Sequence, residues 1–305
     1  MLEQLKEIYR TVGAGGQAEL TFEADGERYT RAFCPPERLI VLGCGHIGQA
    51  LCRYAADLGF AVTAVDERPD YANYTQMPEA AEILCDSFPN AVAQLAVTEN
   101  DYVAVLTRGH RFDADCLRAI LPGAFPKYLG MIGSKRRIAL LLQQLEREGF
   151  SRGDLDRIHA PIGVSINALT VKEIAVSIVA ELIACRRAGL DRRAKETRLA
   201  AEDIDRALLK FLACDESPKA LLLVYEASGS TPVKSGAMMA VDRLGRTVGT
   251  IGGGCSEAAV LTDARRIIGT GQRRSVAVDM SNDIAAEEGM VCGGRMKVLI
   301  EDVSP

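Results

Sequence analysis

The chain has 305 residues, of which 48% are hydrophobic and 25% charged, and its formal net charge is -5. This length predicts about two domains, and the composition is typical of a globular protein rather than a disordered or fibrous one. The negative net charge argues against nucleic-acid binding, which requires a basic surface. No apolar run approaches the roughly 20 residues that cross a bilayer, so membrane contact is not expected.

The first 37 residues predict a helix followed by a small hairpin. The opening segment, MLEQLKEIYRT, has the pattern of a short amphipathic helix and lacks the continuous apolar stretch of a signal peptide. Asp25-Gly26 separates two alternating runs, which is a strong signal for a hairpin turn. We therefore treat residues 1–37 as an N-terminal piece that precedes the first domain.

The next stretch has the pattern strand, glycine turn, helix, strand and acid, in that order. Its parts are a strand at 39–42, the glycines Gly43, Gly45 and Gly48, a helix at 49–58, a strand at 61–65 and the acid Asp66. A lone G-x-G-x-x-G is a weak signal, but here every flanking element is in register. The pattern therefore predicts a nucleotide-binding βαβ unit.

Each residue of this turn has an expected physical role. Gly43 permits a tight turn, Gly45 lets the backbone approach a pyrophosphate, and Gly48 lets helix and strand pack closely. Asp66 is expected to accept a hydrogen bond from a ribose hydroxyl. His46 lies inside the turn, where bulk is usually avoided, and we expect it to contact the ligand.

Strand and helix patterns continue to alternate up to residue 187, which predicts a parallel, doubly wound, Rossmann-like sheet over 38–187. The loops that follow its strands are expected to line a crevice at the carboxyl edge. Lys135 and Arg136 offer positive charge there, and a phosphate contact and a solvated helix face are equally open interpretations. The further expected strands are 102–107 and 128–132, and the further expected helices are 91–96, 114–121, 134–147 and 171–187.

The highly charged stretch 188–203 predicts a linker, after which the texture changes. A helix at 204–213 and five strands with one later helix predict a smaller α+β domain over 204–305. The fold class is therefore α/β, with a Rossmann-like domain followed by the smaller α+β domain. The five expected strands are 220–226, 237–241, 247–251, 275–279 and 295–301.

The second domain has three glycine-dense loops, at 229–239, 249–260 and 289–298. In the second loop, Gly252, Gly253 and Gly254 lead into a helix, which is an arrangement that binds anions. Cys255 follows them, and a helix N-terminus lowers the pKa of a thiol and makes it a better nucleophile. In the third loop Cys292 precedes two further glycines, Gly293 and Gly294, which allow a close backbone approach.

The chain has nine cysteines and no C-x-x-C pair, which favours reduced thiols in the cytoplasm over a disulfide framework. Cys255 and Cys292 are interpreted as functional because glycine clusters are costly in an ordinary core. The three histidines show no metal-ligand spacing, so no metal site is predicted. The cysteines interpreted as small buried hydrophobic residues are Cys34, Cys52, Cys85, Cys116, Cys185 and Cys214.

With these motifs in place, the chain resembles the XdhC/CoxI family of accessory proteins for molybdenum hydroxylases such as xanthine dehydrogenase. The resemblance covers nearly the whole chain after residue 37, with the two domains in the reverse of the usual order. Val233 and Ser235 stand where the family often has Arg and Pro. The motifs that carry it are GCGHIG (43–48), VDER (65–68), YLGMIGSKRR (128–137), HAPIGVSINALTVKEIAVSIVAEL (159–182), GSTP (229–232), GTIGGGCSE (249–257) and GMVCGG (289–294).

The resemblance implies a cofactor-maturation chaperone more than a classical enzyme. Members bind the molybdenum cofactor (molybdopterin) as cargo, support its sulfuration by a cysteine desulfurase, and deliver it to a hydroxylase client. Sulfur and selenium both remain open, and members often form homodimers. The expected cofactor contacts are Thr107, His110, Ser134 and Lys135 together with the glycine-turn residues, and Cys255 and Cys292 are expected to face the metal or carry sulfur.

The main alternative from the sequence is an NAD(P)-dependent oxidoreductase. The βαβ unit supports it, and NAD(P) or another nucleotide would then be the ligand. Asp66 favours NAD over NADP, and the nearby Arg68 weakens that distinction. Against this alternative, the second domain offers no hydride-transfer acid such as a Tyr-x-x-x-Lys pair.

Overall fold

The computed structural model describes residues 1–188, 198–199, 206–279 and 294–304. The chain forms two compact units, Pro36–Leu190 and a second unit made of Met1–Pro35 with Asp191–Pro305. We call the first the Rossmann-like unit and the second the glycine-loop unit. The N-terminal helix and hairpin therefore belong to the same unit as the C-terminal third of the chain.

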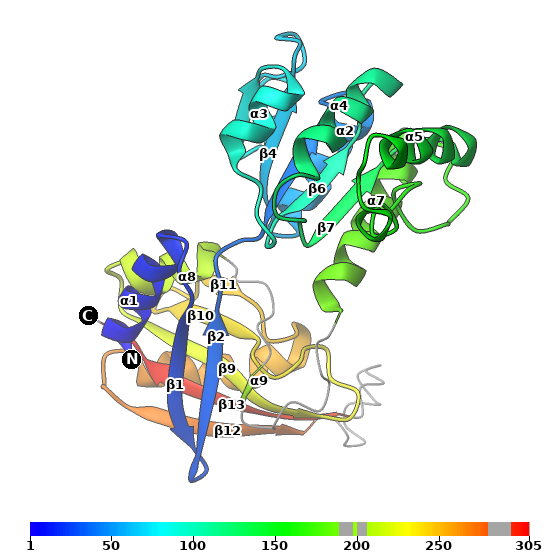
Figure 1. The fold of residues 1–305 in the computed structure, drawn as a ribbon. Helices are drawn as coiled ribbons and strands as arrows, with labels where there is room; N and C mark the ends of the chain where they lie inside the picture. Colours follow the sequence, from blue (N-terminus) through cyan, green and yellow to red (C-terminus); the bar gives the residue numbers. More distant parts are fainter. Residues whose placement is uncertain (189–197, 200–205, 280–293, 305) are drawn as a thin grey trace. The chain divides into compact units, whose positions relative to one another are not determined.

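The Rossmann-like unit is built on a parallel five-stranded sheet with the strand order β5-β4-β3-β6-β7 (Figure 1). Strand order reverses between β3 and β6, so the crevice that parallel sheets use for ligands lies beyond the carboxyl ends of these two strands. The strands are β3 (Arg38–Leu42), β4 (Ala61–Asp66), β5 (Glu82–Cys85), β6 (Tyr102–Val105) and β7 (Tyr128–Met131). The helices are α2 (His46–Asp57), α3 (Phe88–Leu95), α4 (His110–Ile120), α5 (Lys135–Arg147), α6 (Arg152–Leu155) and α7 (Val171–Arg187).

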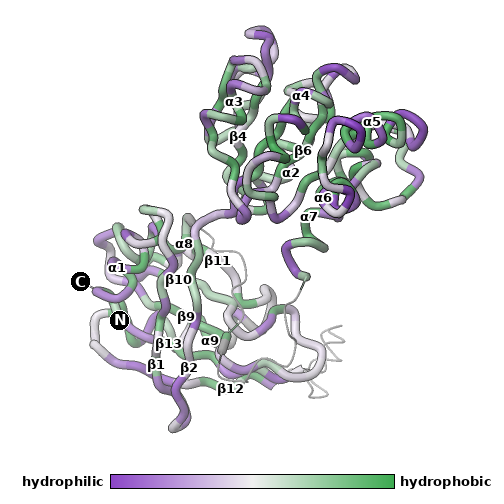
Figure 2. Tube along the Cα trace, in the orientation of Figure 1, coloured by the Kyte–Doolittle hydropathy of each residue, from purple (hydrophilic) through white to green (hydrophobic). Residues whose placement is uncertain are grey.

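Both faces of β3, β4, β6 and β7 are buried, which explains why these strands are apolar. Alternate residues of β3 enter two different clusters, with Ile40 and Leu42 in one and Leu39 and Val41 in the other. Helices α3, α4 and α5 cover the first face, and α2 and α7 cover the second. Figure 2 shows the hydrophobic residues concentrated along the strands, as this packing requires.

The glycine-loop unit is built on an antiparallel sheet with the order β11-β10-β9-β13-β12. One face packs against α9, and the other packs against α1, α8 and the hairpin β1–β2. A short strand, β8 (Arg198–Leu199), pairs in parallel with β2. The sheet strands are β9 (Lys219–Ser228), β10 (Met238–Asp242), β11 (Thr247–Gly249), β12 (Arg273–Asp279) and β13 (Arg295–Asp302). The remaining elements are α1 (Leu2–Gly13), β1 (Ala18–Ala24), β2 (Glu27–Phe33), α8 (Arg206–Cys214) and α9 (Gly254–Ile267).

The fold class predicted from the sequence is confirmed: a Rossmann-like parallel sheet is present, and so is a separate α+β unit with an antiparallel sheet. The hairpin turn at Asp25-Gly26 is also confirmed, with positive φ at both residues. Strand β5 was not predicted, and α4 begins four residues before the expected start. Within the described residues, no helix is both long enough and apolar enough to cross a membrane.

Candidate functional site

The glycine turn that connects β3 to α2 is shaped by two close backbone contacts. A Cβ at Gly43, where φ is +116°, would lie 2.4 Å from the carbonyl oxygen of Leu106. A Cβ at Gly48 would lie 2.1 Å from the carbonyl oxygen of Gly43. A Cβ at Gly45 would meet nothing within 4 Å. The outer two glycines are therefore required by packing, whereas the middle one faces open space.

The first turn of α2 offers backbone N–H groups to an anion. Gly45 is the N-cap, no side chain caps the helix, and its first turn contains no acidic residue. The uncompensated N–H groups and the helix dipole favour a negative charge at this point. His46 is the first residue of α2 and is exposed, which leaves its imidazole accessible beside the turn.

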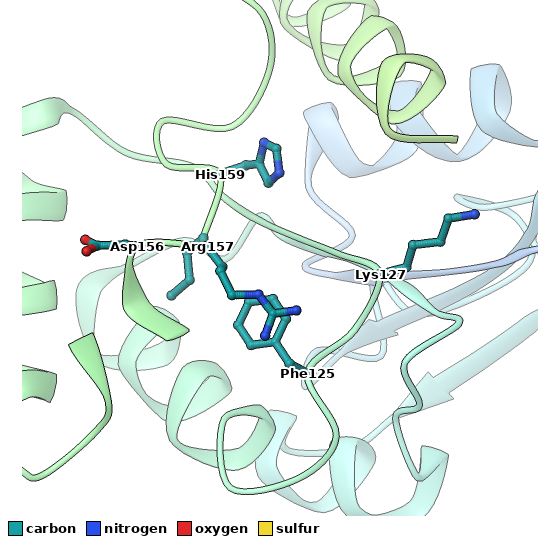
Figure 3. A pocket seen from close by; sticks show the side chains of 6 residues that line it. Phe125, Lys127, Asp156, Arg157 and His159 are labelled. Atoms are coloured by element: carbon teal, nitrogen blue, oxygen red, sulfur yellow. The ribbon is translucent and has the colours of Figure 1, made fainter. Parts of the chain in front are cut away.

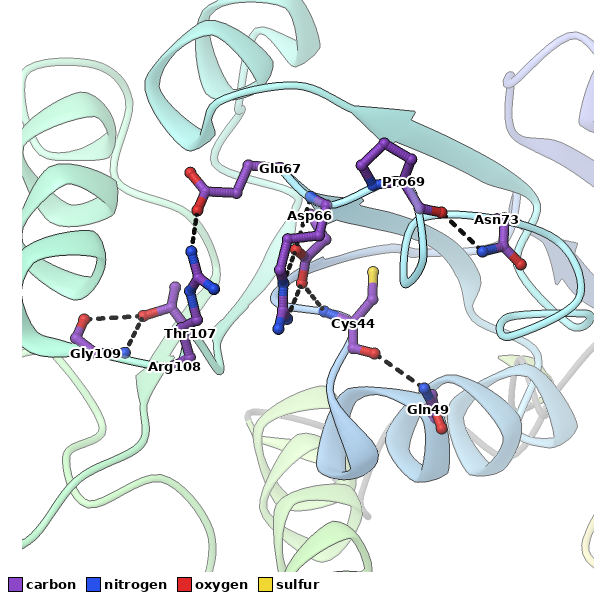
Figure 4. Close-up of polar contacts among 10 residues, drawn as sticks. Cys44, Gln49, Asp66, Glu67, Pro69, Asn73, Thr107, Arg108 and Gly109 are labelled. Carbon is purple, nitrogen blue, oxygen red and sulfur yellow. Dashed lines mark hydrogen bonds and ion pairs between the residues drawn. The ribbon is translucent and has the colours of Figure 1, made fainter.

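Asp66, at the end of β4, accepts hydrogen bonds from two other residues of the chain, Cys44 and Arg68 (Figure 4). Its Oδ1 accepts from the backbone and Nε of Arg68 (3.1 and 2.8 Å), and its Oδ2 accepts from Nη2 of Arg68 and the backbone of Cys44 (both 2.9 Å). Burial alone would raise the pKa of Asp66, but these hydrogen bonds outweigh it and hold the pKa below its ordinary value. The carboxylate thus ties β4 to the glycine turn.

A second ion pair joins the loops that follow β4 and β6. Nη2 of Arg108 donates to Oε1 of Glu67 at 2.7 Å, and both residues are labelled in Figure 4. Because β3 lies between β4 and β6, this pair joins the loops on either side of the β3–α2 turn. The guanidinium of Arg108 also lies over the ring of Phe112, 5.1 Å from its centre.

The residues after β6 and β7 are linked through a buried carboxyl group. Thr107 and Arg137 both donate to Asp113, which is 1% exposed, and burial raises the pKa of Asp113. Ser134 caps α5 by accepting from the backbone of Arg137 at 3.4 Å. Of the predicted contacts here, Thr107 is thus buried and bonded, and Ser134 is a helix cap. The other predicted residues of this edge, His110 and Lys135, are exposed first residues of their helices, and Arg136 is also exposed.

In the glycine-loop unit, the strand register places the described parts of the three glycine loops at the same end of the strands. The C-terminus of β9, the C-terminus of β11 and the N-terminus of β13 all lie at this end. A Cβ at Gly294 would lie 2.5 Å from the carbonyl oxygen of Ser230, so the first and third loops are in contact. Gly293 and Cys292 lie outside the described residues.

The second glycine loop holds an anion that the chain itself provides. Oε1 of Glu257 accepts from the hydroxyl of Thr250 (2.6 Å) and from the backbone of Ile251 (3.1 Å) and Gly253 (3.0 Å). Thr250 also accepts from the backbone of Gly252 at 3.0 Å. Glu257 lies in the first turn of α9, so it also complements the helix dipole.

The backbone of this loop explains the glycine triplet. Gly252, Gly253 and Gly254 all have positive φ, at 119°, 71° and 60°, a region that other residues rarely adopt. Cys255 follows as the second residue of α9, so the predicted position of this cysteine near a helix N-terminus is confirmed. Its proposed chemical role stays a prediction.

A cavity of about 390 Å³ lies elsewhere in the Rossmann-like unit, and none of the predicted cofactor contacts lines it (Figure 3). It is bordered by Phe125, Lys127 and Arg157 close to the amino end of β7. His159 also lines it, with Nδ1 3.1 Å from Glu181, which in turn accepts from Tyr128. Arg157 stacks on Phe125 at 3.7 Å. The cavity walls are therefore held by internal contacts.

The cysteine expectations are only partly correct. Cys52 and Cys116 are buried as predicted, whereas Cys34 and Cys185 are only half-buried. Cys85 and Cys214 are exposed, because each stands at the end of an element. Burial raises the pKa of Cys44 and of Cys52 to about 12, so neither thiol ionises near neutral pH. No group of three or more potential metal ligands occurs among the residues that the structure describes.

Comparison with known proteins matches both units. The XdhC Rossmann domain model matches residues 39–182, and the XdhC and CoxI family model matches residues 213–279. One relative is a Bacillus subtilis (strain 168) protein named as a probable subunit of xanthine dehydrogenase, 27% identical over 60% of this chain and 52% of its own length. Another is the Escherichia coli (strain K12) molybdenum cofactor insertion chaperone PaoD, 30% identical over 50% of this chain and 42% of its own.

Two further relatives also match only part of this chain and part of their own length. Uncharacterized protein YqeB of Escherichia coli (strain K12) is 32% identical over 48% of this chain and 27% of its own length. A crystal structure described as a xanthine dehydrogenase from Bacillus halodurans is 30% identical, with a TM-score of 0.49, over 58% of this chain and 51% of that chain. The chain therefore spans about half or less of the length of these relatives.

The fold and the loops define a two-unit protein that combines a Rossmann-like sheet with a glycine-loop α+β sheet. Each unit matches its own family model, and the two models together cover most of the chain. The chain belongs to the XdhC and CoxI family.

Proposed function

We propose that this protein is a maturation factor that binds molybdenum cofactor as cargo and delivers it to a molybdenum hydroxylase. The observation that carries the proposal is the joint presence of both family domains in one chain, one of whose relatives is named a molybdenum cofactor insertion chaperone. Another relative is named after xanthine dehydrogenase, which supports a hydroxylase as the client. We place the protein in the cytoplasm, where its thiols would stay reduced.

The residues of the glycine turn suit the phosphate end of such a cargo. The first turn of α2 has no acid and no side-chain cap, so its N–H groups are suited to a phosphate. Open space at Gly45 allows the ligand to approach the backbone. His46 is exposed beside the same turn and supplies a further hydrogen-bonding group.

The cysteines of the second unit are proposed to handle sulfur. Cys255 lies in the first turn of α9, where the helix dipole stabilises a thiolate. A cysteine desulfurase would transfer its sulfane sulfur to Cys255 or Cys292 as a persulfide, with selenium as the alternative element. We also expect the protein to form a homodimer, as members of the family often do.

An NAD(P)-dependent oxidoreductase is the second candidate. The parallel strand order and the glycine turn after β3 favour it, because dinucleotides bind at this switch point in such sheets. Under this alternative the purified chain would oxidise NADH or NADPH with a substrate, and would not retain molybdenum.

The test is co-expression of the chain with its natural hydroxylase, followed by purification and analysis of molybdenum and pterin. We expect equimolar molybdenum and pterin on the wild-type chain, and loss of hydroxylase activation with Cys255→Ala or Cys292→Ala. Cys214→Ala, at an exposed cysteine at the end of α8, is the matched control and should activate normally. NADH turnover without molybdenum retention would contradict the proposal and favour the oxidoreductase.

A further inference from the structure

The carboxylate expected to bind a ribose is already saturated. A carboxylate has about four acceptor positions, and Asp66 uses them for the backbone of Cys44, the backbone of Arg68 and two guanidinium bonds from Arg68. The Asp66 side chain is 2% exposed. A ribose diol therefore finds no free acceptor on Asp66 unless Arg68 leaves, and both guanidinium bonds would then be lost.

Arg68 is fixed but not fully used. Its guanidinium is held by Asp66 on one side and stacks on the ring of Tyr71, 3.8 Å from its centre. Its side chain is 27% exposed, and Nη1 has no acceptor among the residues that the structure describes. Arg68 thus presents fixed, charged donors two residues beyond the end of β4, beside the glycine turn.

The charges of the neighbouring groups leave this position open to an anion. Glu67, which lies between Asp66 and Arg68 in the chain, is paired with Arg108. The first turn of α2 contains no acid, and His46 is exposed beside it. A planar guanidinium that is already held in place loses little freedom on binding a phosphate, which it can contact with two donors.

We propose that Arg68, rather than Asp66, selects the ligand of this crevice, and that it selects a phosphate monoester. The inference rests on the proposed function in that the ligand occupies the crevice of the Rossmann-like unit. The monoester could be the phosphate of a pterin cargo or the 2′-phosphate of a nucleotide, since both present the same dianion to the guanidinium. Asp66 then acts as a positioning residue that orients Arg68.

The experiment is calorimetric titration of the full chain with two matched ligand pairs. The first pair is adenosine 2′,5′-bisphosphate and 5′-AMP, and the second is 6-hydroxymethylpterin phosphate and 6-hydroxymethylpterin. We expect the added phosphate to tighten binding at least tenfold in one pair, and that pair identifies the source of the monoester. Arg68→Gln should abolish this ratio. Arg53→Gln, on an exposed arginine of α2 paired with Glu79, should preserve it.

A thermal melt of each variant controls for folding, and Arg68→Lys serves if Arg68→Gln unfolds. Lysine keeps the charge and loses the planar fork, so it should reduce the phosphate ratio without removing it. Equal affinity within both pairs, no binding of any probe, or an unchanged ratio in Arg68→Gln would each overturn the inference. Molybdenum retention is measured separately, so normal retention with a flat ligand series overturns this inference alone. Lost retention with an intact ratio overturns the maturation role instead.

Discussion

The two glycine turns of this protein look alike in sequence and differ in their own charges. The turn before α2 has no acid in the first helical turn and no side-chain cap. The turn before α9 is filled by Glu257, which accepts from two backbone N–H groups and one hydroxyl. At the first turn the nearest bonded carboxylate, Asp66, accepts from Cys44, which precedes the N-cap Gly45, so the first turn of α2 itself has no acid.

The difference shows that a glycine turn is not by itself an anion site. Backbone N–H groups attract any nearby carboxylate, including one from the same helix. At the second turn the glycines allow a backbone conformation with positive φ, and Glu257 stabilises that conformation by accepting from the backbone of Gly253. At the first turn, two glycines are needed for packing and the third faces open space. The proposed phosphate site is therefore at the first turn, whereas the glycines of the second turn, with Glu257, order a loop.

The largest expected effect separates the packing glycines from the middle one. Gly48→Ala places a Cβ 2.1 Å from the backbone of Gly43, so we expect a loss of about 3 kcal/mol or more in the free energy of unfolding. Gly45→Ala meets nothing within 4 Å and should leave stability nearly unchanged while weakening ligand binding. Denaturant unfolding of both variants checks this, and equal stability losses would contradict the assignment of roles.

A smaller effect is expected at Glu257. Glu257→Ala removes the acceptor for Thr250, Ile251 and Gly253, and should cost about 1–2 kcal/mol of stability. Glu257→Gln keeps an acceptor oxygen and should cost less. The alanine variant should also gain binding of inorganic phosphate, measurable by calorimetry, because the carboxylate that accepts from the loop N–H groups is removed. If the wild-type loop already binds phosphate as well as the variant does, the carboxylate does not fill the loop.

The smallest effect concerns acid stability of the Rossmann-like unit. Arg38 contacts both oxygens of Asp101 at 2.8 and 2.6 Å. Burial raises the pKa of Asp101, but these bonds and those from Thr98 hold it below its ordinary value. A lowered folded pKa gives stability that is present above the unfolded pKa of about 3.9 and is lost as pH falls through the folded pKa.

We therefore expect the contribution of Asp101 to wild-type stability, about 1.4 kcal/mol for each unit by which its pKa is lowered, to be lost as the pH falls below 4. In Asp101→Asn this contribution is absent, so the stability gap between the two proteins should narrow as pH falls. Urea unfolding from pH 7 to pH 3 measures the gap. Asp156→Asn, at an exposed carboxylate, is the control and should track the wild type. A gap for Asp101→Asn that stays constant with pH would contradict the pairing.

Sequence patterns predicted the strand–turn–helix of residues 38–66 because every part has a local signal. Strand β5 is only four residues long and lies at the sheet edge, so it gives too short a pattern to be predicted as a strand. Helices α2 and α4 start before their first periodic apolar residue, with His46 and His110 exposed at their starts. These boundaries are set by backbone geometry at the preceding glycine, which apolar spacing does not reveal.

The site was harder to predict than the fold because side-chain partners are chosen in three dimensions. Asp66 has the position of a ribose-binding acid, and only the structure shows that Arg68 donates to both of its carboxylate oxygens. Glu257 lies in the first turn of α9, and its bonds to the loop backbone were not foreseeable from the sequence. The burial of Asp113 beneath Thr107 likewise depends on the packing of α4 against the end of β6.

The most direct test of the maturation role is transfer of cargo in a defined mixture. The purified chain would be loaded with molybdenum cofactor, separated from unbound cofactor, and mixed with a cofactor-free hydroxylase. We predict that hydroxylase activity rises as molybdenum leaves the chain, and that Gly45→Ala, which is expected to stay folded, carries and transfers less. A chain that retains no cofactor after separation, or whose retained cofactor never activates the hydroxylase, would contradict the account.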